Sequence, residues 1–263
     1  MTKILARITK IKVASVSYLN TVPFIYGMDN SAMAGLIDLK LGNPYKCFQL
    51  FHKKQVDIAL IPVGSLPLTE KTRIIFPHCI GADGNVGSVY LLSNTPLKEI
   101  KTIYCDLHSV TSNKLVEILC YEHWKIVPVI RYPETYPPVI GKKDAIVCIG
   151  DKSFKMKEKF KYAFDLGFEW KAMTGLPFVF AVWCTHKNLH PEFIQGFNEA
   201  LDFGISNISE SIDYCKPQII PVADTINYLT KNIIFTIDNK LKEGMEMYLD
   251  SIMPDFKKKI TYI

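Results

Sequence analysis

Short apolar runs alternate with helix-forming stretches along most of this chain, and this alternation limits the fold more than any other feature. Helices are predicted between the apolar runs. One is predicted to start at Asn43-Pro44, with Asn as the cap and Pro at the first position. The clearest begins at Pro191, where Phe193, Phe197 and Leu201 recur at helical spacing. Alternating strands and helices are typical of an α/β protein. Buried strands are predicted at 11–14, 56–61, 102–105 and 144–149.

Two of these strands run into polar turns that precede a helix. The strand at 11–14 leads into a turn that contains Ser17 and Asn20, and Pro23 follows at a position suited to a first helical turn. The strand at 102–105 leads into the hydroxyl-rich segment 109–112. Ligands bind at the carboxyl ends of strands in open α/β sheets, and helix starts favour anions. Because such residues also serve simply as helix caps, the turns alone leave both roles open.

The two turns open two similar blocks, near 1–93 and 94–183, which suggests two lobes with a cleft between them. A chain of 263 residues that is 48% hydrophobic can form one large domain or two smaller ones. A short strand is predicted at 73–76, with loop at 78–85. In the strand predicted at 86–92, two small residues, Gly87 and Ser88, either mark a bulge or let another group approach the backbone.

Composition excludes several classes of protein. The net charge of +5 suits an anionic ligand, but there is no basic stripe with interleaved aromatic residues, so we expect no nucleic-acid partner. Neither a signal peptide nor a membrane span is expected, which favours a cytoplasmic protein. Seven dispersed cysteines without a Cys-x-x-Cys pair predict reduced core thiols. The six histidines lack metal-ligand spacing, so no metal is expected.

The polar residues at strand ends are almost all neutral hydrogen-bond donors. Such a set binds carboxylates through hydrogen bonds and helix starts, and suits either a pure binding protein or an enzyme that orients a reactive substrate. Asp106 and Asp151, at carboxyl ends of strands, are further candidates, whereas Asp57 and Asp144 are expected to be caps. The neutral donors are Ser17, Asn20, Ser88, Ser109, Thr111, Ser112 and Thr174.

Several motifs together resemble one family, the chorismate dehydratases of the futalosine route to menaquinone. The resemblance extends from about Lys12 to Ile252, and the run from Thr174 to Trp183 combined with the Ser17–Asn20 turn is its most specific part. The other motifs that carry it are Asp57-Ile58-Ala59-Leu60-Ile61-Pro62, Ser109-x-Thr111-Ser112, Asp144-Ala145-x-x-x-Ile149-Gly150-Asp151, Asp165-Leu166-Gly167-x-x-Trp170 and Tyr228-Leu229-x-x-Asn232-Ile233.

This resemblance implies a two-lobed α/β fold of the periplasmic-binding-protein type II class. Each lobe would be a mixed sheet flanked by helices, with the ligand cleft between the lobes. The first lobe would comprise 1–93 and 185–263, and the second 94–184. Two crossing strands would join them, near 91–94 and 182–185.

The resemblance also implies an activity, the removal of water from chorismate to give 3-[(1-carboxyvinyl)oxy]benzoate. The enzyme would be a lyase without metal or organic cofactor, a monomer or homodimer, acting on a small dicarboxylate. Asn20 and Ser88 are then expected to be catalytic. The residues expected to bind substrate are Ser17, Tyr18, Ser109, Thr111, Ser112, Asp151, Thr174 and Gly175.

One departure from the family pattern affects charge. Many relatives carry Arg directly before the serine that matches Ser88, and this chain has Gly87 there. Backbone N–H groups, or a Lys or Arg elsewhere, must then neutralise the two carboxylates of the substrate. The proton acceptor is either the enolpyruvyl carboxylate of the substrate or a protein group.

Two other functions are considered. A sister enzyme of the same route, which forms 1,4-dihydroxy-6-naphthoate, opens with a Ser-Pro-Cys-Pro-Asn turn, so the Ser17–Asn20 turn argues against it. A non-catalytic intracellular protein that binds small carboxylates would use the same neutral donors. Incubation with chorismate would distinguish an enzyme from such a binding protein.

Overall fold

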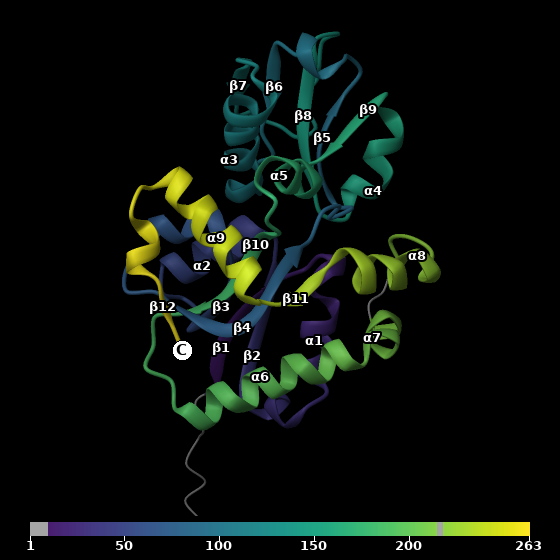
Figure 1. The fold of residues 1–263 in the computed structure, drawn as a ribbon. Helices are drawn as coiled ribbons and strands as arrows, with labels where there is room; N and C mark the ends of the chain where they lie inside the picture. The colour runs from purple at the N-terminus through teal and green to yellow at the C-terminus, as the bar shows by residue number, and fades with distance from the viewer. Residues whose placement is uncertain (1–9, 215–217) are drawn as a thin grey trace, which may run out of the picture.

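A computed structural model describes residues 10–214 and 218–263 as two α/β lobes, each built on one mixed sheet (Figure 1). The first sheet has the order β11-β4-β10-β3-β1-β2, and β12 pairs with β4. Strand β1 is parallel to β2 and β3, whereas β10 is antiparallel to both neighbours. Its strands are β1 (Ile11–Val16), β2 (Ile37–Gly42), β3 (Ile58–Pro62), β4 (Arg73–Ala82), β10 (Phe178–Thr185), β11 (Ile234–Thr236) and β12 (Thr261–Tyr262).

The second sheet has the order β7-β6-β8-β5-β9. Strand β6 is parallel to β7 and β8, whereas β5 is antiparallel to β8 and β9. The sheets therefore confirm the predicted architecture of two mixed sheets. The strands of this second sheet are β5 (Val89–Ser93), β6 (Thr102–Tyr104), β7 (Val129–Arg131), β8 (Asp144–Ile149) and β9 (Tyr162–Asp165).

Helices flank both sheets (Figure 1). Helix α2 begins as predicted, because the Asn43 side chain accepts a hydrogen bond from the Lys46 N–H at 2.8 Å and Pro44 occupies the first turn. The first lobe has α1 (Val22–Asp29), α2 (Pro44–His52), α6 (Pro191–Ser206), α7 (Ile208–Tyr214), α8 (Val222–Asn227) and α9 (Asn239–Ile252), and the second has α3 (Val110–Ile118), α4 (Lys152–Met156) and α5 (Leu166–Thr174).

Shorter helical turns complete the chain. They include two π-helical turns, Leu119–Trp124 and Tyr228–Asn232. The 3-10 turns are Leu19–Thr21, Ala32–Gly35, Val63–Leu68, Leu97–Glu99, Lys157–Lys159 and Phe256–Lys259.

The chain crosses between the lobes at places that differ from the predicted ones. The crossing segments are 83–88, between β4 and β5, and 175–177, between α5 and β10. The predicted crossings near 91–94 and 182–185 lie instead inside sheets: β5 pairs with β8 and β9, and β10 pairs with β3 and β4. Continuous pairing on both edges keeps each strand within one lobe.

Strand β4 is longer than predicted, because 78–82, expected to be loop, continue the strand. This extension pairs with β10 on one side and with β11 on the other, and its residues are buried. Backbone pairing on both edges outweighs the turn propensity of Gly81. The extension carries Ile80 to the cleft between the lobes.

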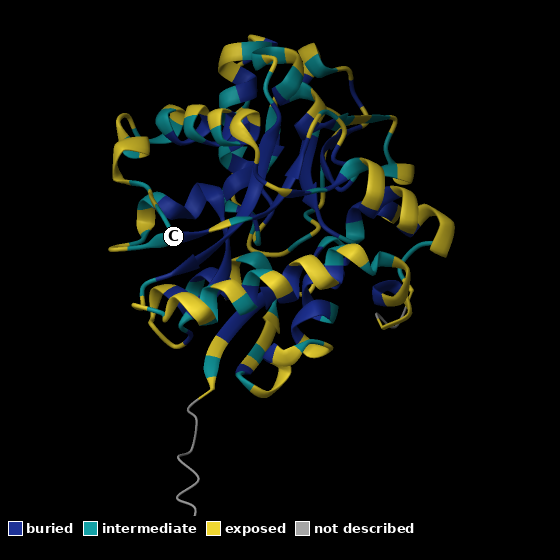
Figure 2. Ribbon diagram, turned by 60° about the horizontal axis from the view of Figure 1, so that its bottom comes forward, coloured by how far each residue is buried: buried dark blue, intermediate teal, exposed yellow. Residues whose placement is uncertain are grey.

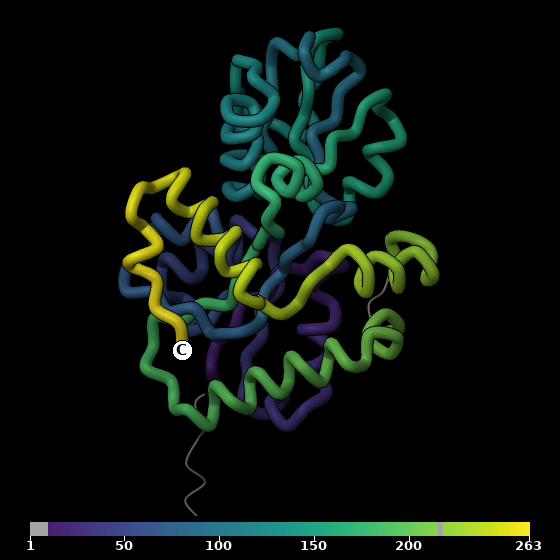
Figure 3. The backbone as a smooth tube through the Cα atoms, viewed as in Figure 1, coloured from purple at the N-terminus to yellow at the C-terminus, as the bar shows by residue number. Residues whose placement is uncertain are grey.

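The buried residues follow the strands of both sheets (Figure 2). An aromatic cluster connects α5, β10 and α9: the Phe178 ring contacts Trp170 at 5.2 Å and Tyr248 at 5.0 Å between centroids, edge to face. In Figure 3 the yellow C-terminal segment, which includes α9, runs on from this cluster and ends in the first lobe. The six described cysteines are buried and free, as predicted, and Cys215 lies outside the described residues.

Helices α1 and α6 pack closely because each carries a glycine at the contact. A Cβ at Gly204 would lie 1.8 Å from the Pro23 carbonyl oxygen, and one at Gly27 would lie 1.9 Å from the Ala200 carbonyl oxygen. Within the described ranges, no helix has both the length and the hydrophobicity needed to cross a membrane.

Candidate active site in the interlobe cleft

A cleft between the lobes collects most of the predicted site residues. Tyr18 and Asn20 reach it from the first lobe, and Ser88 from the crossing segment 83–88. The second lobe contributes the start of α3 and Gly150. Among the described residues that line this cleft, none carries a formal charge. Its donors are hydroxyl, amide and backbone groups, as the sequence predicted.

A hydrogen-bonded pair of hydroxyl groups lies at the cleft wall. The Tyr228 hydroxyl donates to Ser88 Oγ at 2.8 Å, and both side chains are buried. Burial raises the pKa of the Tyr228 phenol, while hydrogen bonding with Ser88 and Asn20 counteracts part of this rise. The phenol therefore remains a neutral donor. Since Ser88 Oγ accepts from Tyr228, its own proton is available to the cleft.

Asn20 brings an unsatisfied acceptor to the same wall. Its Oδ1 atom is buried and has no hydrogen-bond partner among the described residues. Asn20 lies in the 3-10 turn Leu19–Thr21, which Thr21 holds by donating from Oγ1 to the Tyr18 carbonyl oxygen at 2.8 Å. A buried amide oxygen without a partner costs free energy, which a ligand donor would recover.

The start of α3 forms the opposite wall. Ser109 caps this helix, since its Oγ accepts from the Ser112 N–H at 3.1 Å. Thr111 Oγ1 accepts from the Gly64 N–H at 2.9 Å and contacts the Phe180 carbonyl oxygen at 3.4 Å. Ser109, Thr111 and Ser112 are buried and line the cleft. The positive end of the helix dipole thus faces it.

Direct contacts between the lobes keep the cleft closed. Asp151 Oδ1 of the second lobe accepts from the Leu19 N–H of the first at 2.9 Å. The Tyr248 hydroxyl donates to the Thr111 carbonyl oxygen at 3.0 Å. The free volume is about 60 Å³, whereas pockets for small organic ligands measure roughly 300–1,000 Å³. A substrate therefore requires the lobes to separate and then close around it.

The pKa values of Asp151 and Tyr18 are both raised in the closed cleft. Burial raises the pKa of Asp151 to about 6, against the lowering effect of the Leu19 N–H. Burial, followed by the nearby carboxylates Asp106 and Asp151, raises the pKa of the Tyr18 phenol. Asp106 is itself paired with Lys152, whose Nζ lies 2.6 Å from Oδ2. Lys152 is thus committed to a carboxylate.

Gly87 occupies a backbone position that suits glycine. Its φ of +76° lies in the left-handed region, where an arginine side chain would be strained. Asp165 holds this turn, accepting from the N–H groups of Val86 at 3.1 Å and Gly87 at 2.8 Å. The same carboxylate caps α5 through Gly167 and Phe168. The turn therefore supplies no cation to the cleft.

Four predicted binding residues lie outside the cleft lining: Asp151, which makes the interlobe contact with Leu19, and also Ser17, Thr174 and Gly175. Ser17 is exposed, and its Oγ donates to the Gly42 carbonyl oxygen at 3.3 Å. Thr174 Oγ1 donates to the Trp170 carbonyl oxygen at 2.9 Å, within α5. Gly175 ends that helix with a φ of +76° and is exposed. The hydroxyl groups of Ser17 and Thr174 thus bond to backbone carbonyl oxygens, and Gly175 serves as the end of a helix.

Tyr228 is the site residue that was not among the predicted candidates. The motif Tyr228-Leu229-x-x-Asn232 carried part of the resemblance, but the motif alone does not say where the phenol points. It reaches Ser88 because the π-helical turn Tyr228–Asn232 packs against the crossing segment, where Asn232 Nδ2 donates to the Asn85 carbonyl oxygen at 2.8 Å.

Metal-binding clusters are absent from the described part of the chain: no three His, Cys, Asp or Glu side chains gather in a way that could hold an ion. The cleft donors are hard neutral groups of the kind that bind an organic anion.

Comparison with known proteins places the chain in a family. The family model described as menaquinone biosynthesis matches residues 11–253, which include both lobes and the whole cleft. The chain belongs to the menaquinone biosynthesis family. It is similar to a chorismate dehydratase from Campylobacter jejuni subsp. jejuni serotype O:23/36 (strain 81-176), with 26% identity over 246 residues, covering 89% of this chain and 94% of that protein.

Similar solved structures support the fold of this menaquinone-family chain. A protein from Archaeoglobus fulgidus superposes with a TM-score of 0.72 at 15% identity, covering 92% of this chain and 96% of that one. A Candida albicans protein with the generic periplasmic-binding-protein fold gives 0.66 at 13% identity, covering 96% of each. At these identities the likeness concerns the fold alone.

Proposed function

We propose that this protein is a hydro-lyase that converts chorismate into 3-[(1-carboxyvinyl)oxy]benzoate. The observation that carries the proposal is the group formed by Asn20, Ser88 and Tyr228 in the closed cleft of a menaquinone-family chain. The similarity to a protein named chorismate dehydratase supports the choice of substrate.

The proposed reaction removes one water molecule from the ring. The C–H bond at the ether-bearing carbon breaks, and its electron pair forms the new ring double bond. The C–O bond of the ring hydroxyl breaks, and the leaving hydroxide becomes water by gaining one proton, which balances the proton lost from carbon. Because the product ring is aromatic, the step is strongly downhill and requires no potent protein base. The enolpyruvyl carboxylate of the substrate is the proposed proton acceptor.

Ser88 is proposed to donate to the departing hydroxyl. Its oxygen already accepts from Tyr228, so its proton is directed to another acceptor. A chain of two hydrogen bonds, from Tyr228 through Ser88 to the leaving oxygen, strengthens each bond by polarisation. Tyr228 then acts as a positioning residue.

Asn20 is proposed to orient the enolpyruvyl arm. Its amide donates and accepts, and its buried Oδ1 has no partner in the described chain. The start of α3 would hold a ring carboxylate through Thr111 and Ser112, with the helix dipole replacing the missing arginine. Held in this way, the substrate base lies beside the proton that it removes.

The test is to incubate purified protein with chorismate and follow the aromatic product by absorbance and mass. We expect Asn20→Ala and Ser88→Ala each to lower kcat by roughly 10²-fold or more with folding retained. Tyr228→Phe should lower kcat by about tenfold while KM changes little, because only the polarising bond is lost. Ser206→Ala, at the exposed end of α6, is the control.

Three outcomes would contradict the proposal. Wild-type turnover in both the Asn20 and Ser88 variants would remove these residues from catalysis. Saturable chorismate binding without product would favour a binding protein, and turnover of cyclic dehypoxanthine futalosine instead of chorismate would favour the sister reaction.

A further inference from the structure

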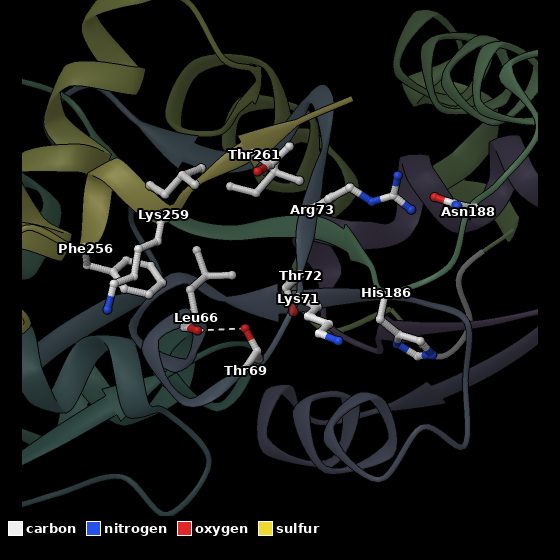
Figure 4. A pocket seen from close by; sticks show the side chains of 12 residues that line it. Leu66, Thr69, Lys71, Thr72, Arg73, His186, Asn188, Phe256, Lys259 and Thr261 are labelled. Carbon is white, nitrogen blue, oxygen red and sulfur yellow. Dashed lines mark hydrogen bonds between the residues drawn. The ribbon is translucent and has the colours of Figure 1, made fainter.

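A second pocket lies at the far end of the first lobe from the cleft, and the proposed dehydration does not use it. This distal pocket, drawn in Figure 4, is formed by residues of the Val63–Leu68 turn, the start of β4, the segment after β10 and the C-terminal segment. It measures about 590 Å³, within the roughly 300–1,000 Å³ range of small-molecule sites. Arg73 at its wall and Ile80 at the cleft lie roughly 20 Å apart along β4.

The lining of the distal pocket is basic. It contains Lys71, Arg73, Lys259 and His186, and no Asp or Glu. Within the described ranges none of the three permanent cations has a carboxylate within 4.0 Å, whereas Lys187 nearby is paired with Asp57. A smaller adjoining hollow adds one cation, Lys54, and one carboxylate, Glu70, so the region keeps its positive charge.

The donors gather on one side of the pocket. In Figure 4 the Lys71 amine points toward His186, and the Arg73 guanidinium lies on the same side of the picture. Arg73 donates to the Lys187 carbonyl oxygen, which orients the guanidinium and leaves further N–H donors free. Asn188 adds a neutral amide beside it.

His186 adds an imidazole ring to the wall of the distal pocket. Its Nε2 atom is buried and has no hydrogen-bond partner in the described chain, although the ring packs edge to face on Phe51 at 5.0 Å. Burial lowers the pKa of His186, so the imidazole is neutral near pH 7 and carries one N–H.

The other side of the pocket is apolar. Leu66, Phe256 and Ile260 line it, and Lys259 lies at its edge. The site therefore joins a cluster of cationic donors to a surface that suits a hydrophobic or aromatic body. The two cations on the donor side, Lys71 and Arg73, exceed the charge of one carboxylate and match a phosphate ester, which carries about −1.5 to −2 near pH 7 and offers three acceptor oxygens.

We propose that the distal pocket binds a phosphate monoester with an apolar or aromatic body. The phosphate would contact Lys71, Arg73 and His186, and the body would lie against Phe256. This site is separate from the chorismate cleft and would be occupied independently of it.

Calorimetry with phenyl phosphate, at low ionic strength and pH 8, tests this site. We expect one-to-one binding that weakens as salt is added. Arg73→Gln and Lys71→Gln should each weaken it by roughly tenfold, since each removes a charged hydrogen bond. Lys142→Gln, an exposed lysine of the second lobe, removes the same charge elsewhere and should leave the affinity unchanged. Asn20→Ala should also leave it unchanged, which separates this site from the cleft.

The same titration distinguishes the two halves of the ligand. Inorganic phosphate should bind more weakly than phenyl phosphate, and phenol should not bind measurably. Absence of saturable binding would overturn the proposal. So would unchanged affinity in both the Arg73 and Lys71 variants, or phenol binding as tightly as its phosphate. Lys71 has no structural hydrogen bond among the described residues, so its variant stays informative if Arg73→Gln disturbs folding. Chorismate turnover plays no part in this readout.

Discussion

The contact between Asp151 and the Leu19 N–H makes the stability of the closed protein depend on pH in a specific way. Burial raises the pKa of this carboxyl from its ordinary value of 3.8 to about 6. A group with a raised pKa contributes its full stability below pH 4, and that contribution is lost as the pH rises through 6. We therefore expect ionisation of Asp151 to destabilise the closed form between pH 4 and pH 7.

The size of the effect follows from the shift. About two pKa units correspond to about 3 kcal/mol, and partial solvent access reduces this to about 2 kcal/mol. Asp151→Asn keeps an oxygen that accepts from the Leu19 N–H and removes the titration. The variant should gain about 2 kcal/mol in unfolding free energy relative to wild type as the pH rises from 4 to 7.

Urea unfolding, followed by the fluorescence of the three buried tryptophans, measures this difference at each pH. The control is Asp250→Asn, because a hydrogen bond from Lys257 lowers the pKa of Asp250 and the difference should run in the opposite direction. If the wild type opens instead of unfolding, its radius of gyration rises with pH while that of Asp151→Asn does not. The reasoning would be refuted if neither the stability difference nor the change in radius of gyration is seen. It would also be refuted if Asp151→Asn gains stability relative to wild type as the pH falls.

Two further substitutions test the close backbone contacts. Gly150→Ala should lower the affinity for chorismate by roughly tenfold or more, because a Cβ there would lie 2.5 Å from the Tyr18 ring, at a φ of +68°, and would hold the lobes apart. Titration of the ligand-induced change in fluorescence measures this affinity. An unchanged affinity would show that lobe closure tolerates the added methyl group. Gly204→Ala should lower the unfolding free energy by about 3 kcal/mol, since its Cβ would meet the Pro23 carbonyl oxygen. The control is Gly35→Ala, because a Cβ at Gly35 would meet no atom within 4 Å. Equal melting temperatures for the Gly204→Ala and Gly35→Ala variants would contradict the close packing of α1 and α6.

The sequence by itself determined the local structure. The strands that open the two lobes, the cap of α2 by Asn43 and the start of α6 at Pro191 lie where they were predicted, because periodicity and capping depend on near neighbours. The resemblance also indicated the two-lobed fold and the family, because several motifs spread along the chain all resemble the same family.

The tertiary structure alone decided which polar residues share the cleft. Ser17 and Thr174 have the same chemistry as Ser88 and Ser112, but their hydroxyl groups serve the local backbone. Tyr228 reaches Ser88 across 140 positions of sequence. Such contacts depend on which strands pair and where the chain crosses between lobes, and neither follows from local propensity. For the same reason the distal pocket, whose walls come from four separate segments, had no signal in the sequence.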